Sequence, residues 1–293
     1  MKRVLVTGAS GFLGWHICRR ASMNWKVFGT YFSHPVEIPG VVMNWADLTR
    51  FKTIKSFFDT VRPDALIHTA AASDPNLCQQ NPDLSYKVNT EASIALAGLC
   101  ADFGIPCVFT SSDLVFNGLN PPYSEADDPS PINRYGEHKL LAEKGMRKKY
   151  PGTTICRMAL MFGASATVSG SFLKPLLQNM RSGREVPLFT DEFRTPLSGK
   201  DAADGILTAL EAKPPILHLG GSERISRYAF GCLVQRLYRI PGANLLPVLQ
   251  KELSLPAPRP PDLSFDISKA VSLGFKPQPL EEALKNLAET RDP

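Results

Sequence analysis

The sequence predicts an α/β protein in which helices cover both faces of a parallel sheet, with a smaller C-terminal lobe interleaved with the sheet domain. In the first two-thirds of the chain, short apolar strands alternate with segments of helical spacing, as in sheets built from helical crossovers. A glycine-rich turn at residue 8 connects the first strand directly to a helix. After about residue 158 the alternation loosens and prolines interrupt the chain.

The individual elements follow from these patterns in chain order. Residues 51–61 repeat apolar side chains at helical spacing, and residues 92–100 form a second helix candidate. Segments 186–189 and 216–219 are interpreted as strands that return to the sheet, accompanied by helices at 171–180 and 201–212. Residues 226–261 are expected to form a helix followed by proline-broken chain, and residues 280–287 a last helix. The first five strands are expected at 3–6, 26–30, 65–68, 106–110 and 154–157. We therefore assign residues 1–160 to the sheet domain, with return segments near 186–220, and residues 161–293 mainly to the lobe.

Composition excludes several classes of protein. The 33 Lys+Arg against 28 Asp+Glu give a net charge of +5, and this mild, dispersed excess argues against nucleic-acid binding as the main role. The six cysteines form no CxxC pair and have no histidine at metal-ligand spacing, which indicates reduced thiols in a cytoplasmic protein without a metal site. No stretch approaches the roughly 18 apolar residues that span a bilayer. The composition favours a cytoplasmic protein with a small-molecule substrate, and a homodimer is compatible with it.

The glycine-rich turn predicts a dinucleotide cofactor. Gly8, Gly11 and Gly14 are spaced three residues apart between the first strand and the following helix. Such glycines permit the tight turn, the close approach of backbone to a pyrophosphate, and the packing of helix on strand. The pyrophosphate then lies against free N–H groups at the positive end of the helix dipole. This makes the fold a Rossmann-type doubly wound sheet, and the cofactor is expected to contact the turn along Ser10, Phe12 and Leu13.

The residues after the second strand bear on which cofactor binds. NAD sites usually place an acidic residue about 20 residues beyond the glycine turn, where it binds the ribose 2′-hydroxyl. Here Tyr31, Ser33 and His34 occupy the region, and no acid precedes Glu37. Because Ser33 and His34 can donate hydrogen bonds to a 2′-phosphate, the sequence favours NADP(H) over NAD.

Asp47 and Leu48 follow a short strand candidate and are candidates for the adenine contact. The carboxylate of Asp47 can accept a hydrogen bond from the exocyclic amine of adenine. The alternative is that Asp47 caps the N-terminus of a helix over residues 49–61. The sequence leaves both interpretations open.

A serine, a tyrosine and a lysine form the candidate catalytic set. Tyr135 and Lys139 are four residues apart and therefore share one helix face, and Ser112 follows the strand expected at 106–110. The ammonium of Lys139 is expected to favour tyrosinate and to lower the pKa of Tyr135, and the Ser112 hydroxyl can hydrogen-bond a substrate carbonyl. This arrangement predicts the reduction of a carbonyl group.

Several motifs together resemble the extended short-chain dehydrogenases/reductases. They are TGASGFLG at the turn, ALIHTAAA at residues 65–72, Val88-Asn89, SSDLVF and YGEHK. Within that superfamily, residues 111–143 and 259–275 are similar to dTDP-4-dehydrorhamnose reductase and its relatives. The resemblance implies that Ala70 and Ala71 line the wall beside the cofactor, that Ser112 and Asp113 stand where the family has Thr-Asp, that Tyr135 donates the proton, and that Lys139 holds the nicotinamide ribose.

The substrate side departs from the family pattern. Leu114 replaces the tyrosine of the family's TDYVF, and Leu160 stands where these reductases tend to have a tryptophan near the sugar nucleotide. Arg194, in the segment DEFRT, lies where extended members place an arginine against substrate phosphate; the alternative is that it pairs with a carboxylate. These changes leave the catalytic set intact and put dTDP-4-dehydrorhamnose itself in doubt as substrate.

Three functions follow from these residues. The leading hypothesis is an NADPH-preferring reductase of a keto sugar, in particular a nucleotide-linked 4-keto-deoxysugar. A second is a sugar-nucleotide epimerase or dehydratase that retains NAD(P). The third is a non-catalytic NADP-binding subunit, because the regulatory subunit of methionine adenosyltransferase also resembles dehydrorhamnose reductase.

Overall fold

The computed structural model describes residues 1–164 and 170–290. Its centre is a seven-stranded sheet in which every neighbouring pair is parallel, in the order β11-β6-β5-β4-β1-β2-β3. The central strands are buried along their whole length, as expected where helices cover both faces. The predicted α/β fold class is confirmed, and the strands are β1 (Arg3–Thr7), β2 (Lys26–Tyr31), β3 (Val41–Trp45), β4 (Ala65–His68), β5 (Cys107–Ser112), β6 (Thr153–Met158) and β11 (Ile216–Leu219).

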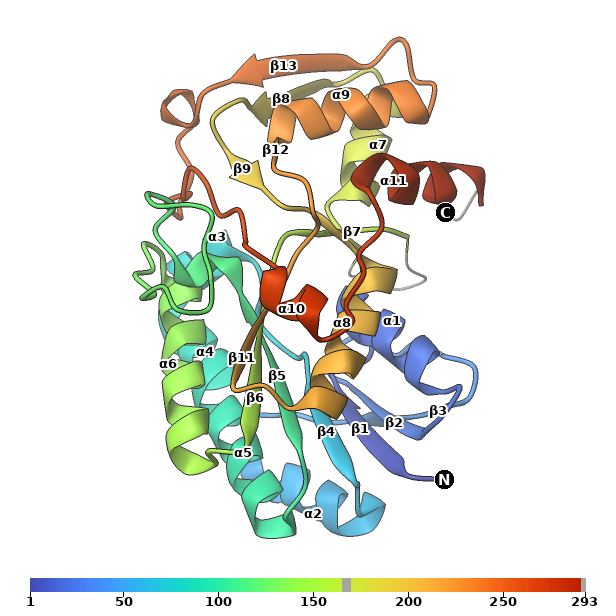
Figure 1. Ribbon diagram of the computed structural model, residues 1–293, viewed down its shortest axis with the longest axis vertical. Coiled ribbons are helices and arrows are strands. Elements are labelled where there is room, and N and C mark those ends of the chain that lie inside the picture. Colours follow the sequence, from blue (N-terminus) through green and yellow to red (C-terminus); the bar gives the residue numbers. More distant parts are fainter. Residues whose placement is uncertain (165–169, 291–293) are drawn as a thin grey trace.

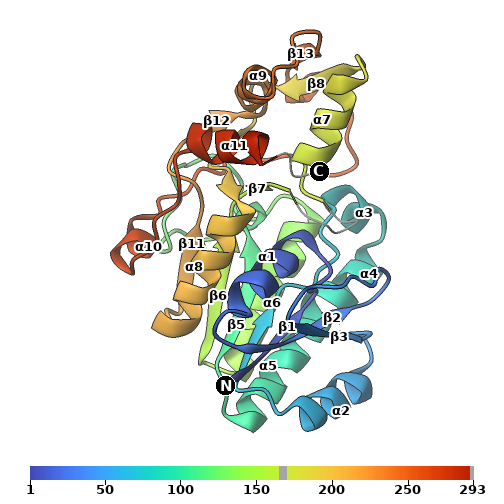
Figure 2. The same cartoon turned by 90° about the vertical axis from the view of Figure 1, so that its right-hand side faces the viewer.

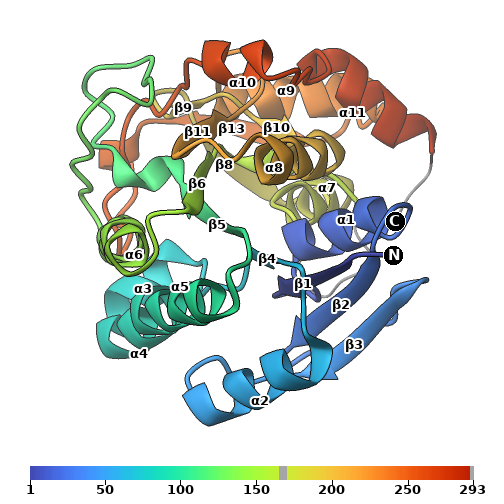
Figure 3. The ribbon, with the colours of Figure 1, turned by 60° about the horizontal axis from the view of Figure 1, so that its bottom comes forward.

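Helices form a layer on each face of the sheet (Figure 3). α1 (Phe12–Ala21) and α8 (Gly199–Ala212) pack on one face, and a cluster that includes Val6, Ile17 and Ile206 joins them to the strands. α2 (Phe51–Val61), α5 (Ala92–Phe103) and α6 (Arg134–Lys149) cover the other face around Phe58 and Phe109. Three short segments, α3 (Pro75–Gln80), α4 (Pro82–Tyr86) and the π-helical turn η1 (Lys87–Glu91), connect β4 to α5.

The lobe lies beyond the carboxyl ends of the strands (Figures 1 and 2). Its helices are α7 (Leu173–Arg181), α9 (Arg227–Leu237) and α11 (Leu280–Glu289), which share a separate apolar cluster around Phe162, Phe230 and Leu284. Its strands are β8 (Glu185–Phe189), β9 (Phe193–Arg194), β12 (Ile225–Ser226) and β13 (Asn244–Val248), and two further short strands, β7 (Met161–Phe162) and β10 (Leu197–Ser198), pair where the chain enters and leaves it.

One topological expectation is wrong. The strand expected at 186–189 does not return to the central sheet, because β8 pairs in parallel with β13 inside the lobe. β13 contains Pro247, which in a two-stranded sheet can occupy an edge without the loss of a ladder hydrogen bond. The return to the sheet is made by α8 and β11. α10 (Ser268–Ser272) and the chain after it then pack beside them, through Ala270 of the helix and Phe275 of the following segment.

All six cysteines fall among the described residues as free thiols, five of them buried. Within residues 1–164 and 170–290, the search for a helix of sufficient length and apolarity to cross a bilayer finds none.

Candidate active site

The glycine turn is packed too closely for side chains. Gly8 has a φ of +70°, and a Cβ atom there would lie 2.7 Å from the Cα of Ala70. A Cβ on Gly14 would collide with the carbonyl oxygen of Gly8. Gly11 precedes α1 as its N-cap, donates its N–H to the Gly8 carbonyl at 2.9 Å, and leaves the first turn of α1 without a side-chain cap. Free N–H groups at a helix N-terminus beside a glycine cradle fit the diphosphate of a dinucleotide.

The remaining residues of the turn differ in what they offer a cofactor. Ser10 and Phe12 are half-buried, whereas Leu13 is buried in the core and presents only its backbone. The ring of Phe12 packs edge-to-face on His16, with centroids 4.9 Å apart. Ser10 is the hydroxyl nearest in sequence to the free end of α1.

The wall beside the turn is held by an asparagine. Ala70 touches Gly8, and Ala70 and Ala71 are both half-buried after β4. The amide of Asn89 accepts from the Ala72 N–H at 2.9 Å and donates to the Ala72 carbonyl at 3.0 Å. Asn89 lies in the π-helical turn, and such turns often mark functional sites. The sequence analysis noted Asn89 as a motif residue without finding this structural role.

Of the two interpretations of Asp47, the structure excludes the helix cap. α2 begins at Phe51 with Arg50 as its N-cap, so Asp47 does not cap this helix. Its carboxylate instead accepts from the N–H and hydroxyl of Thr49, at 3.0 and 2.7 Å, and pairs with Arg50 at 3.1 Å. The hydrogen bond from Thr49 is the main cause that lowers the pKa of Asp47. Leu48 packs against the apolar cluster beneath α2, and the adenine contact of both residues stays a prediction.

The end of β2 presents a polar pair to solvent. The Ser33 hydroxyl and Nδ1 of His34 lie 2.8 Å apart, and both residues are exposed. Tyr31, the last residue of β2, is half-buried. The three residues thus lie together at the carboxyl edge of the sheet, as expected for a contact with the cofactor ribose.

One face of α6 carries the candidate catalytic residues. Tyr135, Lys139 and Glu143 follow at intervals of four and are all buried. The start of the helix lies against the 3-10 turn η2 (Asp113–Val115), where a Cβ on Gly136 would collide with the Leu114 carbonyl oxygen. This close approach sets the phenol of Tyr135 beside the Ser112 hydroxyl, which acts on its pKa.

The expected effect of Lys139 on Tyr135 is wrong for this structure. Burial raises the pKa of Tyr135, and the nearby Ser112 hydroxyl only partly opposes the shift. Lys139 is itself fully buried, and burial lowers its pKa to about 7. Its Nζ lies 4.0 Å from the centroid of the Phe109 ring, a cation–π distance. Tyr135 is protonated at neutral pH, as any phenol is, and burial makes it a weaker acid than a tyrosine in water.

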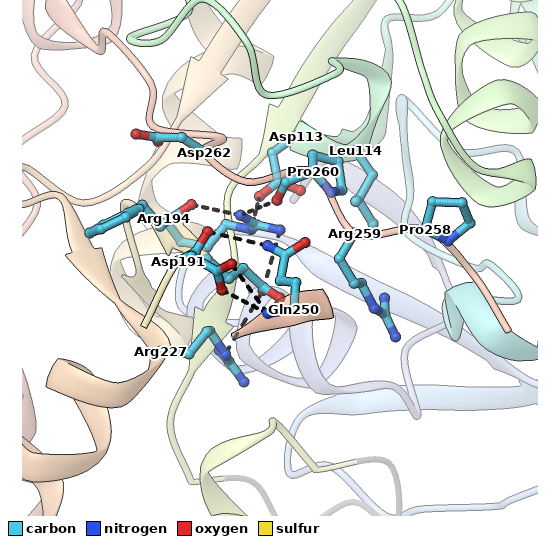
Figure 4. A network of polar contacts seen from close by, with 12 residues as sticks. Asp113, Leu114, Asp191, Arg194, Arg227, Gln250, Pro258, Arg259, Pro260 and Asp262 are labelled. Carbon is cyan, nitrogen blue, oxygen red and sulfur yellow. Dashed lines mark hydrogen bonds and ion pairs between the residues drawn. The ribbon is translucent and has the colours of Figure 1, made fainter. Parts of the chain in front are cut away.

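Asp113 connects Ser112, a candidate catalytic residue, to the lobe. Its Oδ1 accepts from the Ser112 hydroxyl at 3.0 Å, and its Oδ2 lies 3.7 Å from Nε of Arg194 (Figure 4). Burial raises the pKa of Asp113 to about 6, and Arg194 acts in the opposite direction. Arg194 also pairs with Glu192 at 3.3 Å. Arg194 therefore pairs with carboxylates, as one of the two interpretations expected, and its contact with substrate stays a prediction.

The two leucines of the altered substrate wall are half-buried. Leu114 packs against the apolar cluster formed by Val115, Phe116 and Phe265. Leu160 accepts the N–H of Leu197 with its carbonyl at 2.9 Å, next to the paired strands β7 and β10. Both lie between the sheet and the lobe, in agreement with a position near substrate.

The structure adds polar residues of the lobe that the sequence analysis missed. Arg227 and Gln250 come from α9 and the turn after β13, and Arg259 from the chain that returns to the sheet (Figure 4). Arg259 donates from Nη2 to the Asn76 side chain at 3.2 Å. Arg259 opens the second segment that resembles the reductases, whereas Arg227 and Gln250 belong to no motif in the sequence.

Comparisons with known proteins show the family to which the chain belongs. Residues 1–292 match the family model described as the RmlD substrate binding domain. The solved dTDP-4-dehydrorhamnose reductase of Clostridium acetobutylicum is 26% identical, with a TM-score of 0.86 over 98% of this chain and 99% of that one. The subunit beta of methionine adenosyltransferase 2 from Xenopus laevis is 29% identical over 282 residues, 94% of this chain and 83% of the relative. The probable low-salt glycan biosynthesis reductase Agl14 of Haloferax volcanii is 30% identical over 291 residues, 96% of each chain. The match along the whole chain, on a Rossmann-type sheet with an intact glycine turn, confirms the resemblance to the dehydrorhamnose reductases: the chain belongs to the RmlD substrate binding domain family.

Proposed function

We propose that this protein is an NADPH-dependent reductase of a keto sugar, in particular a nucleotide-linked 4-keto-deoxysugar. The observation that carries the proposal is the buried set of Ser112, Tyr135 and Lys139 on β5 and α6, in a sheet whose first strand leads into the glycine turn. Relatives named as reductases support the reaction class. The altered wall at Leu114 and Leu160 supports a substrate that differs from dTDP-4-dehydrorhamnose.

The chain's own residues supply the acid chemistry of this reaction. NADPH supplies a hydride when bound. Tyr135 is protonated at neutral pH and donates its phenolic proton to the oxygen of the reacting carbonyl. Ser112 hydrogen-bonds the same oxygen and orients it. Lys139 donates hydrogen bonds to the hydroxyls of the nicotinamide ribose.

The preference for NADPH rests on the end of β2. Ser33 and His34 provide two exposed polar groups where an acid would repel a 2′-phosphate. Phosphate oxygens accept hydrogen bonds from hydroxyl and imidazole N–H groups. We therefore place the adenosine 2′-phosphate against this pair.

The direct test is the substitution Tyr135→Phe. Loss of the general acid should lower kcat by roughly 10²–10⁴-fold while NADPH binding is retained. Tyr150→Phe, at the far end of the same helix, is the control and should keep full activity. Undiminished reduction of a keto sugar by Tyr135→Phe would overturn the proposed mechanism.

Two other functions would give different results when the purified protein is assayed with NADPH and a keto sugar. The relatives named methionine adenosyltransferase 2 subunit beta favour a non-catalytic NADP-binding subunit as the second candidate. In that case the purified protein would bind NADPH, reduce no keto sugar and copurify with another enzyme. An epimerase or dehydratase would retain NAD(P) and convert substrate without net consumption of NADPH.

A further inference from the structure

His68 is a fully buried histidine that connects the glycine turn to the π-helical turn η1. It is the last residue of β4 and lies opposite Thr7, the residue before Gly8. Its Nδ1 lies 2.6 Å from the Thr7 hydroxyl, and its Nε2 lies 2.9 Å from the hydroxyl of Ser93 on α5. The Ser93 hydroxyl donates to the backbone carbonyl of Asn89 at 2.8 Å. Groups from β1, β4, α5 and η1 therefore form one buried chain of hydrogen bonds.

The direction of each hydrogen bond in this chain is fixed. A carbonyl can only accept, so the Ser93 hydroxyl gives its single proton to Asn89 and must accept from Nε2 of His68. A neutral imidazole with its proton on Nε2 accepts at Nδ1, where the Thr7 hydroxyl is the donor. Burial lowers the pKa of His68 to about 3, and the charge of Lys139 acts in the same direction. The ring is therefore neutral at physiological pH, as the chain of hydrogen bonds requires.

The first end of the chain bears on the glycine turn. The Thr7 carbonyl accepts from the N–H and the hydroxyl of Thr69, at 3.2 and 2.7 Å, and the Gly8 N–H donates to the Thr30 hydroxyl at 3.2 Å. Gly8 has a φ of +70°, so the backbone changes direction directly after Thr7. The positions of the N–H groups that follow therefore depend on where the end of β1 is held, and His68 holds it by the side chain of Thr7.

The second end of the chain bears on the wall beside the turn. The side chain of Asn89 holds both backbone groups of Ala72, and its amide also donates to the Ser85 hydroxyl at 3.1 Å. Its backbone carbonyl belongs to the chain of hydrogen bonds that passes through His68. Loss of the imidazole would therefore release a constraint on the end of β1 and a constraint on η1 at the same time.

We propose that His68 is a positioning residue for the dinucleotide, which holds the glycine turn and η1 in one arrangement through Thr7 and Ser93. This inference rests on the proposed function only for the dinucleotide cofactor and not for the reduction of a sugar. Donors that are already in place lose less conformational freedom when a ligand binds, so they bind it more tightly. The diphosphate is common to NADPH and NADH, and the contribution of His68 is therefore the same for both.

Two substitutions divide the chain of hydrogen bonds at the imidazole. In His68→Asn the amide oxygen is as many bonds from Cβ as Nδ1 was, so it can accept from Thr7 but does not reach Ser93. In His68→Gln the amide nitrogen takes the place of Nε2 and can donate to Ser93, whereas the bond to Thr7 is lost. Each variant should raise the Kd for NADPH and the Kd for NADH by one common factor, roughly three- to tenfold, since one buried hydrogen bond is broken.

The control is His218→Gln, because His218 is also fully buried in the central sheet, with Nδ1 3.0 Å from the Tyr123 carbonyl oxygen. This variant should lower Tm and leave both Kd values unchanged. Thermal unfolding gives Tm, and equilibrium titration of the folded proteins gives the Kd values. Thr7→Val removes the donor to Nδ1 and should raise both Kd values, whereas Thr7→Ser keeps a hydroxyl and should restore them. The Thr7 pair decides the question if the His68 variants fail to fold.

Unchanged Kd values in the folded His68 and Thr7 variants would show that the chain stabilises the fold alone and would overturn the inference. A rise for NADPH without a rise for NADH would also overturn it, because the effect would then belong to the 2′-phosphate. The proposed reductase fails by a different result, a wild-type protein that binds the dinucleotides and reduces no keto sugar.

Discussion

The ion pair between Glu143 and Arg157 attaches the catalytic helix to the sheet. Glu143 is one turn beyond Lys139 on the buried face of α6, and Arg157 lies on β6. The two carboxylate oxygens accept from Nε and Nη2 of Arg157 at 3.1 and 2.8 Å, and both side chains are at most 5% exposed. Arg157 also lies over the Phe116 ring, 5.1 Å from its centroid. The substitution Glu143→Gln leaves the guanidinium buried without its counter-charge.

Removal of one partner of a buried ion pair costs about 3–5 kcal/mol of unfolding free energy. For a protein of 293 residues, that loss lowers Tm by roughly 5–8 °C. The carboxylate of Glu143 also raises the pKa of Lys139, which burial has lowered to about 7. Its loss should move the pKa of Lys139 further down, so less of the lysine is charged at neutral pH and NADPH binds more weakly.

Thermal unfolding and urea titration measure the loss of stability, and fluorescence titration with NADPH measures the weaker binding of the cofactor. Glu281→Gln is the control, because Glu281 pairs with Arg236 and Lys285 in an exposed position, where a salt bridge contributes only about 0–1 kcal/mol. If Glu143→Gln were as stable as this control, the pair would not anchor α6 and the reasoning would be refuted.

Two further predictions concern the cofactor. Gly14→Ala should abolish NADPH binding, because the added Cβ would collide with the Gly8 carbonyl. The control is Gly242→Ala, where a Cβ meets nothing within 4 Å, and it should bind NADPH as the wild type does; equilibrium titration measures both. His34→Ala should raise the Kd for NADPH roughly tenfold by loss of a charge-assisted hydrogen bond and leave the Kd for NADH unchanged. Equal affinities for NADPH before and after that substitution would remove His34 from the cofactor site.

The cofactor half of the site could be predicted because its determinants are local in sequence. Three glycines within seven residues indicate a backbone that admits no side chains. In the structure a Cβ on Gly8 would meet Ala70, and a Cβ on Gly11 or Gly14 would meet the carbonyl oxygen of Gly8. Tyr135 and Lys139 share a face by helical spacing alone. Their pKa values could not be predicted in this way, because burial depends on how the sheet and neighbouring helices close around them.

The part of the candidate site that lies in the lobe could be predicted only in part, because residues far apart in sequence come together there. Arg227 is placed by α9, whereas Arg259 arrives with the chain that returns to the sheet and is anchored by Asn76 of α3. No spacing rule connects such positions. The strand β13 was missed for a related reason: Pro247 is typical of broken chain until its partner β8 is known.

Asp113 couples the lobe to the catalytic serine. The Ser112 hydroxyl accepts the N–H of Leu114 at 3.2 Å and donates to Asp113 at 3.0 Å. While Asp113 is ionised, this bond uses the only proton of Ser112, so Ser112 has none for a substrate carbonyl. Once Asp113 is protonated, its own O–H can donate to Ser112, and the serine proton becomes available to the carbonyl oxygen.

The pH profile of reduction should show this change in the hydrogen bond between Ser112 and Asp113. Burial raises the pKa of Asp113 to about 6, so the carboxyl is protonated below that pH and ionised above it, and kcat/KM should fall as pH rises through about 6. Loss of charge on Lys139, whose pKa is lowered to about 7, acts in the same direction at higher pH. The substitution Asp113→Asn separates the effect of Asp113 from that of Lys139, because an amide N–H can donate to Ser112 at every pH. In this variant the fall in kcat/KM near pH 6 should disappear, and the fall at higher pH, caused by Lys139, should remain. A step near pH 6 that survives in Asp113→Asn would assign it to another group and break the proposed link between Arg194, Asp113 and Ser112.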